Sequence, residues 1–100
     1  MSAAHTPGPW TMETVRTSCG VCFKVGPFPW KNGKLNHACI YADYPSPGGP
    51  EYKTAVANAQ LIAAAPDLFF QLLAAANYID ALGGNSDSYR AALSKATGEA

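Results

Sequence analysis

Residues 58–68 read NAQLIAAAPDL, and this stretch decides the fold of the 100-residue chain. Around it, apolar residues recur at spacings of three and four, the period of one face of an α-helix: Tyr52, Ala55, Val56, Ala59, Ile62 and Ala63. Pro66 interrupts a helix interior but suits the first turn of a new helix, where Asp67 complements the helix dipole. The stretch therefore predicts a helix over residues 51–65 and a kink or helix break at Ala65-Pro66.

A second helix is expected after the proline, because a wide apolar stripe follows at helical spacing: Leu68, Phe69, Leu72, Leu73, Ala76, Ile79 and Leu82. Gly83-Gly84 provides its C-terminal stop. We expect this helix to supply most of the core. Residues 85–87, Asn-Ser-Asp, can cap a short final helix that ends near Ala96. The apolar face of that helix is thin, so it should fray or pack on a partner.

Before residue 50 the apolar period is two, which is typical of strands. Strands are expected over residues 11–17, 21–25 and 35–42, and Asn32-Gly33 predicts a type I′ turn between the last two. One face of this sheet should meet the helices with Val21, Phe23, Val25, Ala38 and Ile40, while Cys22, Cys39 and Tyr41 point away. The predicted class is α+β: a three-stranded antiparallel β-meander packed against two consecutive helices broken at Ala65-Pro66, plus a short C-terminal helix.

A single small domain over residues 1–100 is expected from the length. Residues 1–10 form an extended lead-in, because two prolines exclude a helix there, and Trp10 should anchor it to the core. Residues 11–44 form the β region, residues 45–50 a Pro/Gly loop, and residues 51–97 the helical region. A domain of this size has a small core, so a homo-oligomer is expected.

The charge balance excludes several partner classes. Lys plus Arg and Asp plus Glu both number seven, and neither sign forms a run. Such a chain does not attract duplex nucleic acid or an anionic membrane. No stretch approaches the roughly 18 consecutive apolar residues of a membrane span, and the first residues do not resemble a secretory signal. We therefore expect a cytoplasmic protein without a membrane partner.

One candidate metal site is present: Cys19 and Cys22 in a CxxC motif, followed by His37 and Cys39. Three thiolates and an imidazole make a tetrahedral zinc site. A strict Asn32-Gly33 turn places Cys22 opposite Asp43 and separates the two ligand pairs, whereas a broader loop with Cys22 opposite Cys39 brings them together. The simpler interpretation is three partly buried cysteines in a reducing compartment, with no resident cofactor.

Enzyme chemistry is not expected. His5 and His37 can act as bases, yet no Ser or Cys nucleophile lies in a recognisable elbow, and no carboxylates are suitably paired. A thioredoxin-type use of the CxxC motif requires a helix that lowers the pKa of the first thiol, and here strand-like sequence flanks the motif.

The candidate binding surface consists of aromatic and basic residues in the β region: Trp30, Lys31, Lys34, Tyr41 and Tyr44. Trp30 beside two lysines can stack on a small nucleotide signal, or it can sit at a hairpin tip used for protein contacts. No glycine-rich phosphate cradle accompanies the aromatics, which favours the protein partner.

The chain resembles small bacteriophage and prophage proteins in two places. These are HTPGPW at residues 5–10 and ANAQLIAAAPDL at residues 57–68. The resemblance implies a phage accessory protein that acts in the cytosol of the bacterial host. Small non-enzymatic proteins of this kind commonly bind host proteins or inhibit defence systems. Both motifs are structural, and the cysteines lie in the variable middle region.

Overall fold

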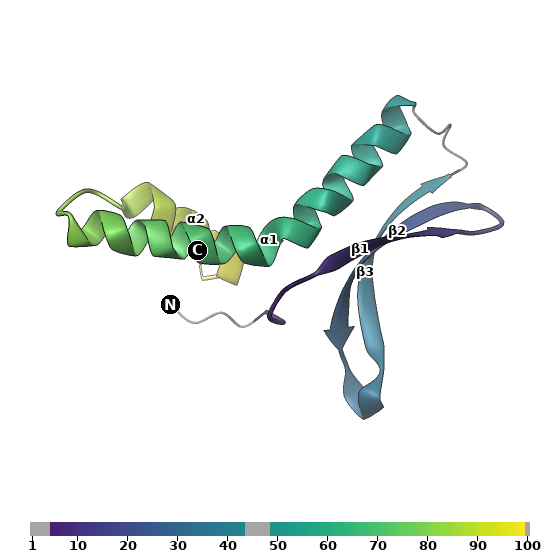
Figure 1. Cartoon of the computed structure of the whole chain (residues 1–100), viewed down its shortest axis with the longest axis horizontal. Coiled ribbons are helices and arrows are strands. Elements are labelled where there is room, and N and C mark those ends of the chain that lie inside the picture. Colours follow the sequence, from purple (N-terminus) through teal and green to yellow (C-terminus); the bar gives the residue numbers. More distant parts are fainter. Residues whose placement is uncertain (1–4, 44–48, 100) are drawn as a thin grey trace.

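The computed structural model describes residues 5–43 and 49–99 and has a sheet followed by helices (Figure 1). In chain order the elements are β1 (Thr11–Arg16), β2 (Gly20–Pro29), a 3₁₀ turn η1 (Lys31–Gly33), β3 (Leu35–Asp43), α1 (Pro50–Ala81) and α2 (Asp87–Thr97). The strands are antiparallel in the order β1-β2-β3. The predicted α+β class and three-stranded antiparallel sheet are therefore confirmed.

The main core lies between the sheet and the first half of α1. Val21, Phe23 and Val25 of the central strand are buried, and they join Ala55 and Ala59 of α1 in one cluster. Alanines on the helix allow it to approach the sheet closely, and the ring of Tyr52 packs edge-on against Phe23 at 5.4 Å between centroids. The prediction of which face of β2 is buried is confirmed, because the side chains of this strand alternate with a clean period of two.

The β2–β3 hairpin turns at the predicted dipeptide. Asn32 and Gly33 have φ values of 61° and 73°, the positive values that a type I′ turn requires. The strict ladder from this turn does not persist. Pro29 pairs with Leu35, one residue away from the register that the turn sets, and the pairing shifts by one more residue between Val25 and Phe28, around a proline that cannot donate a ladder hydrogen bond. Cys22 therefore lies opposite Tyr41 rather than Asp43. The register at Cys22 thus differs by two residues from that of the strict ladder. Because side chains alternate between the two faces of a sheet, Cys22 keeps its predicted face, the one that points away from the helices.

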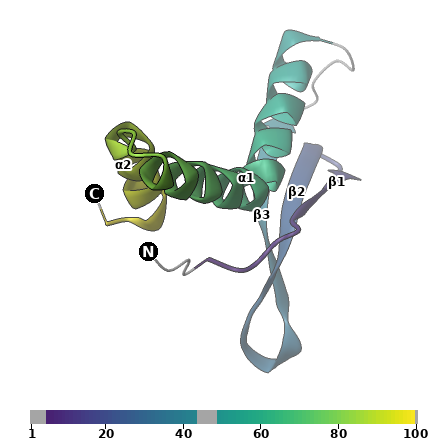
Figure 2. The ribbon, with the colours of Figure 1, turned by 60° about the vertical axis from the view of Figure 1, so that its left-hand side comes forward.

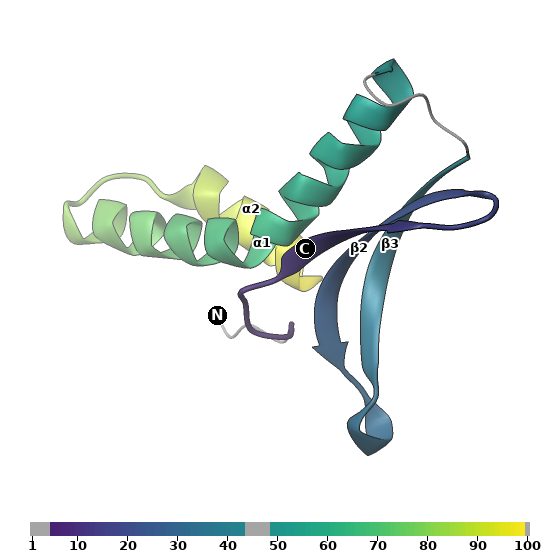
Figure 3. The ribbon, with the colours of Figure 1, turned by 45° about the vertical axis from the view of Figure 1, so that its right-hand side comes forward.

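α1 differs from the prediction of two separate helices. It is one helix of 32 residues that contains Pro66, and it bends near its middle (Figures 1 and 2). Proline lacks the N–H that would bond four residues back, and its ring crowds that carbonyl, so the helix bends there without ending. Beyond the bend, α1 points away from the sheet and runs beside α2 (Figure 3). The expectation that this half covers the sheet and supplies most of the core is wrong.

The second half of α1 forms a small core of its own with α2. Phe69 and Ala76 pack against Leu93, which is 1% exposed. Ser86 donates a hydrogen bond to Asp80 Oδ1 at 2.5 Å, and the Arg90 guanidinium pairs with the other oxygen of that carboxylate. These contacts hold the short helix on α1. The thin apolar face of α2 is thus packed within the chain.

The N-terminal lead-in packs against the bend on its outer side, where the Pro66 ring lies (Figure 1). The His5 ring lies 5.2 Å from that of Phe69, and the Trp10 indole N–H donates to the Thr6 carbonyl at 3.0 Å. Gly8 touches the buried Pro66, and a Cβ at Gly8 would lie only 3.0 Å from the proline Cγ. Trp10 packs against the main core, as predicted. The two motifs that carry the phage resemblance therefore contact each other.

Replacing Phe23 by Ala should lower the free energy of unfolding by about 3–5 kcal/mol, because the ring is fully buried in the main core. Leu35→Ala is the control, since that side chain is 58% exposed and its loss should change stability by less than about 0.5 kcal/mol. Urea unfolding followed by circular dichroism measures both. Equal effects of the two substitutions would contradict the placement of the core.

The α1–α2 junction should weaken in acid. The Ser86 hydrogen bond, followed by that from Arg90, lowers the pKa of Asp80 below its usual value of 3.8. A carboxyl with a depressed pKa in the folded state stabilises the fold above its unfolded pKa, and this contribution is lost as the pH falls through the folded pKa. The urea midpoint of Asp80→Asn should lie below that of the wild type at pH 7, and this difference should shrink as the pH falls below 3.8 and through the lower folded pKa of Asp80. A difference between the two urea midpoints that stays constant as the pH falls would exclude this linkage.

Candidate functional site

The end of the β2–β3 hairpin extends beyond the rest of the sheet. β1 pairs with β2 only as far as Gly26, whereas β2 continues to Pro29 and pairs there with Leu35. The hairpin therefore projects away from both helices, toward the bottom of Figure 1. A partner can reach its tip from several sides.

The tip presents apolar and basic side chains together. Trp30 is 61% exposed and Leu35 58% exposed, and Lys31 and Lys34 between them are exposed as well. The Trp30 N–H donates to the Lys34 carbonyl at 2.7 Å, and the Lys34 N–H donates to that of Lys31 at 3.2 Å. These bonds fix the loop, so its side chains are displayed on an ordered backbone. We call Trp30, Lys31, Lys34 and Leu35 the tip patch.

Sequence reasoning identified three of the four residues of the tip patch and missed Leu35. The available signal was the position of Leu35 directly after the Asn32-Gly33 turn, where a large apolar residue at the hairpin end has no core to enter. Pairing with Pro29 places it on the tip.

Tyr41 does not belong to the tip patch. It lies six residues further along β3 than Leu35, which is about 20 Å at 3.3 Å per residue. Loss of surrounding water and the neighbouring Asp43 carboxylate raise the pKa of the Tyr41 phenol. Its hydroxyl thus stays protonated at neutral pH. Tyr44, the remaining residue of the predicted surface, lies outside the described residues.

The predicted zinc ligands are not brought together as a set. Cys22 and Cys39 form a disulfide on the outer face of the sheet, with their Cα atoms 6.0 Å apart, whereas Cys19 is free and exposed. His37 is exposed and lies beside Gly26. Among residues 5–43 and 49–99, no three His, Cys, Asp or Glu side chains are placed to share a metal ion. Of the four predicted ligands, the structure joins only Cys22 and Cys39, and it joins them as a disulfide.

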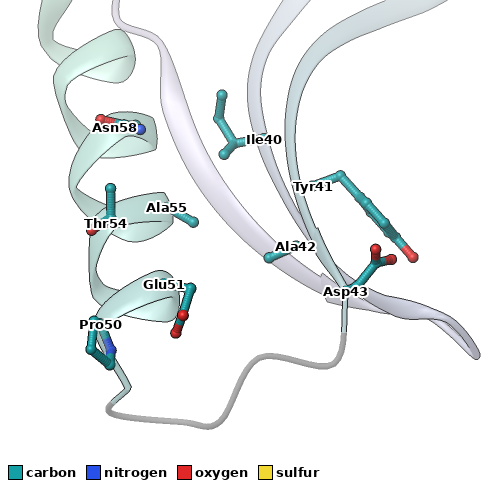
Figure 4. Close-up of a pocket in the computed structure, with 9 residues that line it drawn as sticks. All are labelled: Ile40, Tyr41, Ala42, Asp43, Pro50, Glu51, Thr54, Ala55 and Asn58. Atoms are coloured by element: carbon teal, nitrogen blue, oxygen red, sulfur yellow. The ribbon is translucent and has the colours of Figure 1, made fainter.

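A cleft of about 560 Å³ lies between β3 and the start of α1 (Figure 4). Ile40 and Ala42 face Ala55 across it, while Tyr41 projects from the opposite face of the strand. Asp43 and Glu51 contribute carboxylates to the cleft, and none of the described residues that line it is basic. A cleft with two carboxylates is poorly suited to a phosphate-bearing ligand.

The cysteine arrangement predicts a thiol count. In protein oxidised in air, one thiol per folded chain should react with a thiol reagent, and Cys19→Ser should abolish that reaction, because the other two cysteines are paired. Reduction and unfolding should reveal three. Elemental analysis of protein purified without added metal should find less than about 0.1 equivalent of zinc. A full equivalent, lost together with Cys22, would favour the metal site.

Comparison with known proteins supports the phage resemblance. Neither the curated proteins nor the solved structures contain a match to this sequence. The family described as Salmonella phage P22 protein Y8K6 matches the chain over residues 1–100. Because this match spans the lead-in, the sheet and both helices, the chain belongs to the Salmonella phage P22 protein Y8K6 family.

Proposed function

We propose that this phage accessory protein is non-enzymatic and binds a host protein through the tip patch. The observation that carries the proposal is the exposure of Trp30 and Leu35 on an ordered hairpin that projects from the sheet. Solvent exposure of a tryptophan gives no folding benefit, and tryptophan is enriched among residues that dominate binding energy. The tip is thus best explained by a complex in which it is covered.

The chemistry of the tip patch defines the partner. Trp30 supplies a large apolar surface with one indole N–H, which suits a pocket of matching shape with an acceptor at its edge. Lys31 and Lys34 flank it, so the rim of that pocket should carry carboxylates. A small nucleotide signal is the alternative, and stacking on Trp30 supports it. No α-helix begins at the tip to bind its phosphates, so we favour the protein.

Inhibition of a host defence system is the role we infer for this binding. The supporting observation is membership of a phage family, since a small phage protein in an infected cell meets host machinery directly. Action in the host cytosol follows from the same inference. The chain needs no catalytic group for this role, because occupying a functional surface of the target is enough.

Substitution of Trp30 by Ala should weaken binding of the host partner at least about thirtyfold, equivalent to a hot-spot loss of about 2 kcal/mol. The partner is captured from host lysate on immobilised wild-type protein and purified. Calorimetry then measures its affinity for the wild type and for Trp30→Ala. Tyr78→Ala is the matched control, because Tyr78 is 66% exposed on α1, away from the hairpin. Its affinity should equal that of the wild type.

Two results would contradict the proposal. In the first, Trp30→Ala and the wild type bind the captured protein equally well. In the second, cyclic nucleotides shift the Trp30 fluorescence at micromolar concentration while no host protein is retained, which would favour the nucleotide alternative. Circular dichroism of each variant shows whether the fold is intact.

A further inference from the structure

Six apolar residues of α1, and Leu82 directly after its last residue, follow the spacing of a coiled-coil seam. The intervals alternate between four and three residues over three heptads, through Leu61, Ala65, Leu68, Leu72, Ala75, Ile79 and Leu82. This period of 3.5 is the one at which a helix keeps its apolar side chains against a second helix running alongside. We call these seven residues the α1 stripe.

The chain covers the α1 stripe only in part. Leu61, Leu68 and Leu82 are 63%, 54% and 69% exposed, whereas Ala65, Leu72 and Ile79 are half-buried. α2 packs on Phe69 and Ala76, with Leu72 of the stripe packed against the same cluster, and the sheet packs on Ala55 and Ala59. The stripe thus borders an open groove of about 240 Å³ between the two helices, with small residues Ala92 and Ala96 on the α2 side. Every residue that lines this groove is apolar.

The dimensions of the chain also indicate that more of its surface is exposed than in a compact domain of this size. Its accessible surface is 6768 Å², roughly a quarter more than expected for a compact protein of 10.5 kDa. Its radius of gyration is 16.9 Å, against about 13 Å for a compact domain of 100 residues. The second half of α1 and α2 together form a helical hairpin. In the described part of the chain, this helical hairpin buries three hydrophobic residues, Phe69, Ala76 and Leu93. Such a small core leaves the hairpin dependent on further contacts.

A membrane is the first candidate to cover the stripe, since α1 is long and apolar enough by length and composition to cross one. The arrangement of the helix argues against it. Pro66 bends α1, its first half is tied to the sheet, and Asp80 holds α2 through Arg90 within the same segment. Insertion would have to break these contacts and bury charges in hydrocarbon.

The geometry points to a second copy of this chain as the occupant, with the two α1 stripes packed against each other. A seam of this period is self-complementary, so a twofold axis brings each stripe onto its equivalent and joins two helical hairpins into a four-helix arrangement. The stripe carries no charge to oppose its own copy. The part of the stripe beyond the bend at Pro66, from Leu68 to Leu82, is about 21 Å long at 1.5 Å per residue.

Light scattering after size-exclusion chromatography tests this proposal. Wild-type protein should have a mass of at least twice the 10.5 kDa of one chain. Leu68→Lys should reduce the mass to one chain and raise the dissociation constant at least about a hundredfold, because the interface would bury an unpaired charge. Leu35→Lys is the matched control, since Leu35 is exposed to a similar degree on the hairpin tip. It should leave the mass unchanged.

If Leu68→Lys does not fold, Leu82→Lys at the far end of the same stripe provides the same test. Circular dichroism identifies the folded variants, and the mass of the folded one is the result. A wild-type monomer at high micromolar concentration would overturn the proposal, as would equal masses for the stripe variants and the wild type. Binding of the monomer to phospholipid vesicles would show instead that a membrane covers the stripe.

Discussion

The bend at Pro66 is the constraint on which the rest of the structure depends. A 32-residue helix is about 48 Å long at 1.5 Å per residue, much longer than a three-stranded sheet can cover. Because proline removes one helical hydrogen bond and crowds the preceding turn, α1 changes direction at the edge of the sheet. One half of the helix closes the main core, and the other half is free to pair with α2.

The bend also explains why the two family motifs occur together. Pro66 is fully buried, and the backbone of Gly8 lies directly against its ring. His5 and Trp10 pack on either side of this contact, on Phe69 and on the main core. The lead-in lies on the outer side of the bend, so that its contacts with Pro66 and Phe69 bury the helix surface at the kink. We infer that HTPGPW and the proline of the helix stabilise one bend jointly.

The two exposed surfaces lie on different elements. The tip patch is at the end of the β2–β3 hairpin, and the α1 stripe runs along the helix from Leu61. They differ in chemistry, since the tip patch combines an aromatic ring with lysines whereas the stripe is wholly apolar. Self-association through the helices would leave the tips free and would present two of them per dimer. Two linked tips bind a target that offers two sites more tightly than one tip does.

The local elements were determined by the sequence, as Val21, Phe23 and Val25 show for the buried strand face and Asn32-Gly33 for the turn. Such features depend on side-chain period and on backbone dihedral preferences, which neighbouring residues set. The candidate site was predicted in part. Trp30 and its two lysines lie together at the turn, whereas Tyr41 lies about 20 Å along β3 at 3.3 Å per residue and is not part of the tip patch.

Contacts between distant segments were decided only by the tertiary structure. Pro66 predicts an interruption, yet whether a helix stops or bends there depends on what supports the two halves, namely the sheet, α2 and the lead-in. The pairing of Cys22 with Cys39 likewise depends on the shift near Pro27, which no local preference specifies. Sequence by itself determined which faces are apolar. The fold decided which of them meet within the chain and which, like part of the α1 stripe, stay exposed, because burial is a property of the whole packed arrangement.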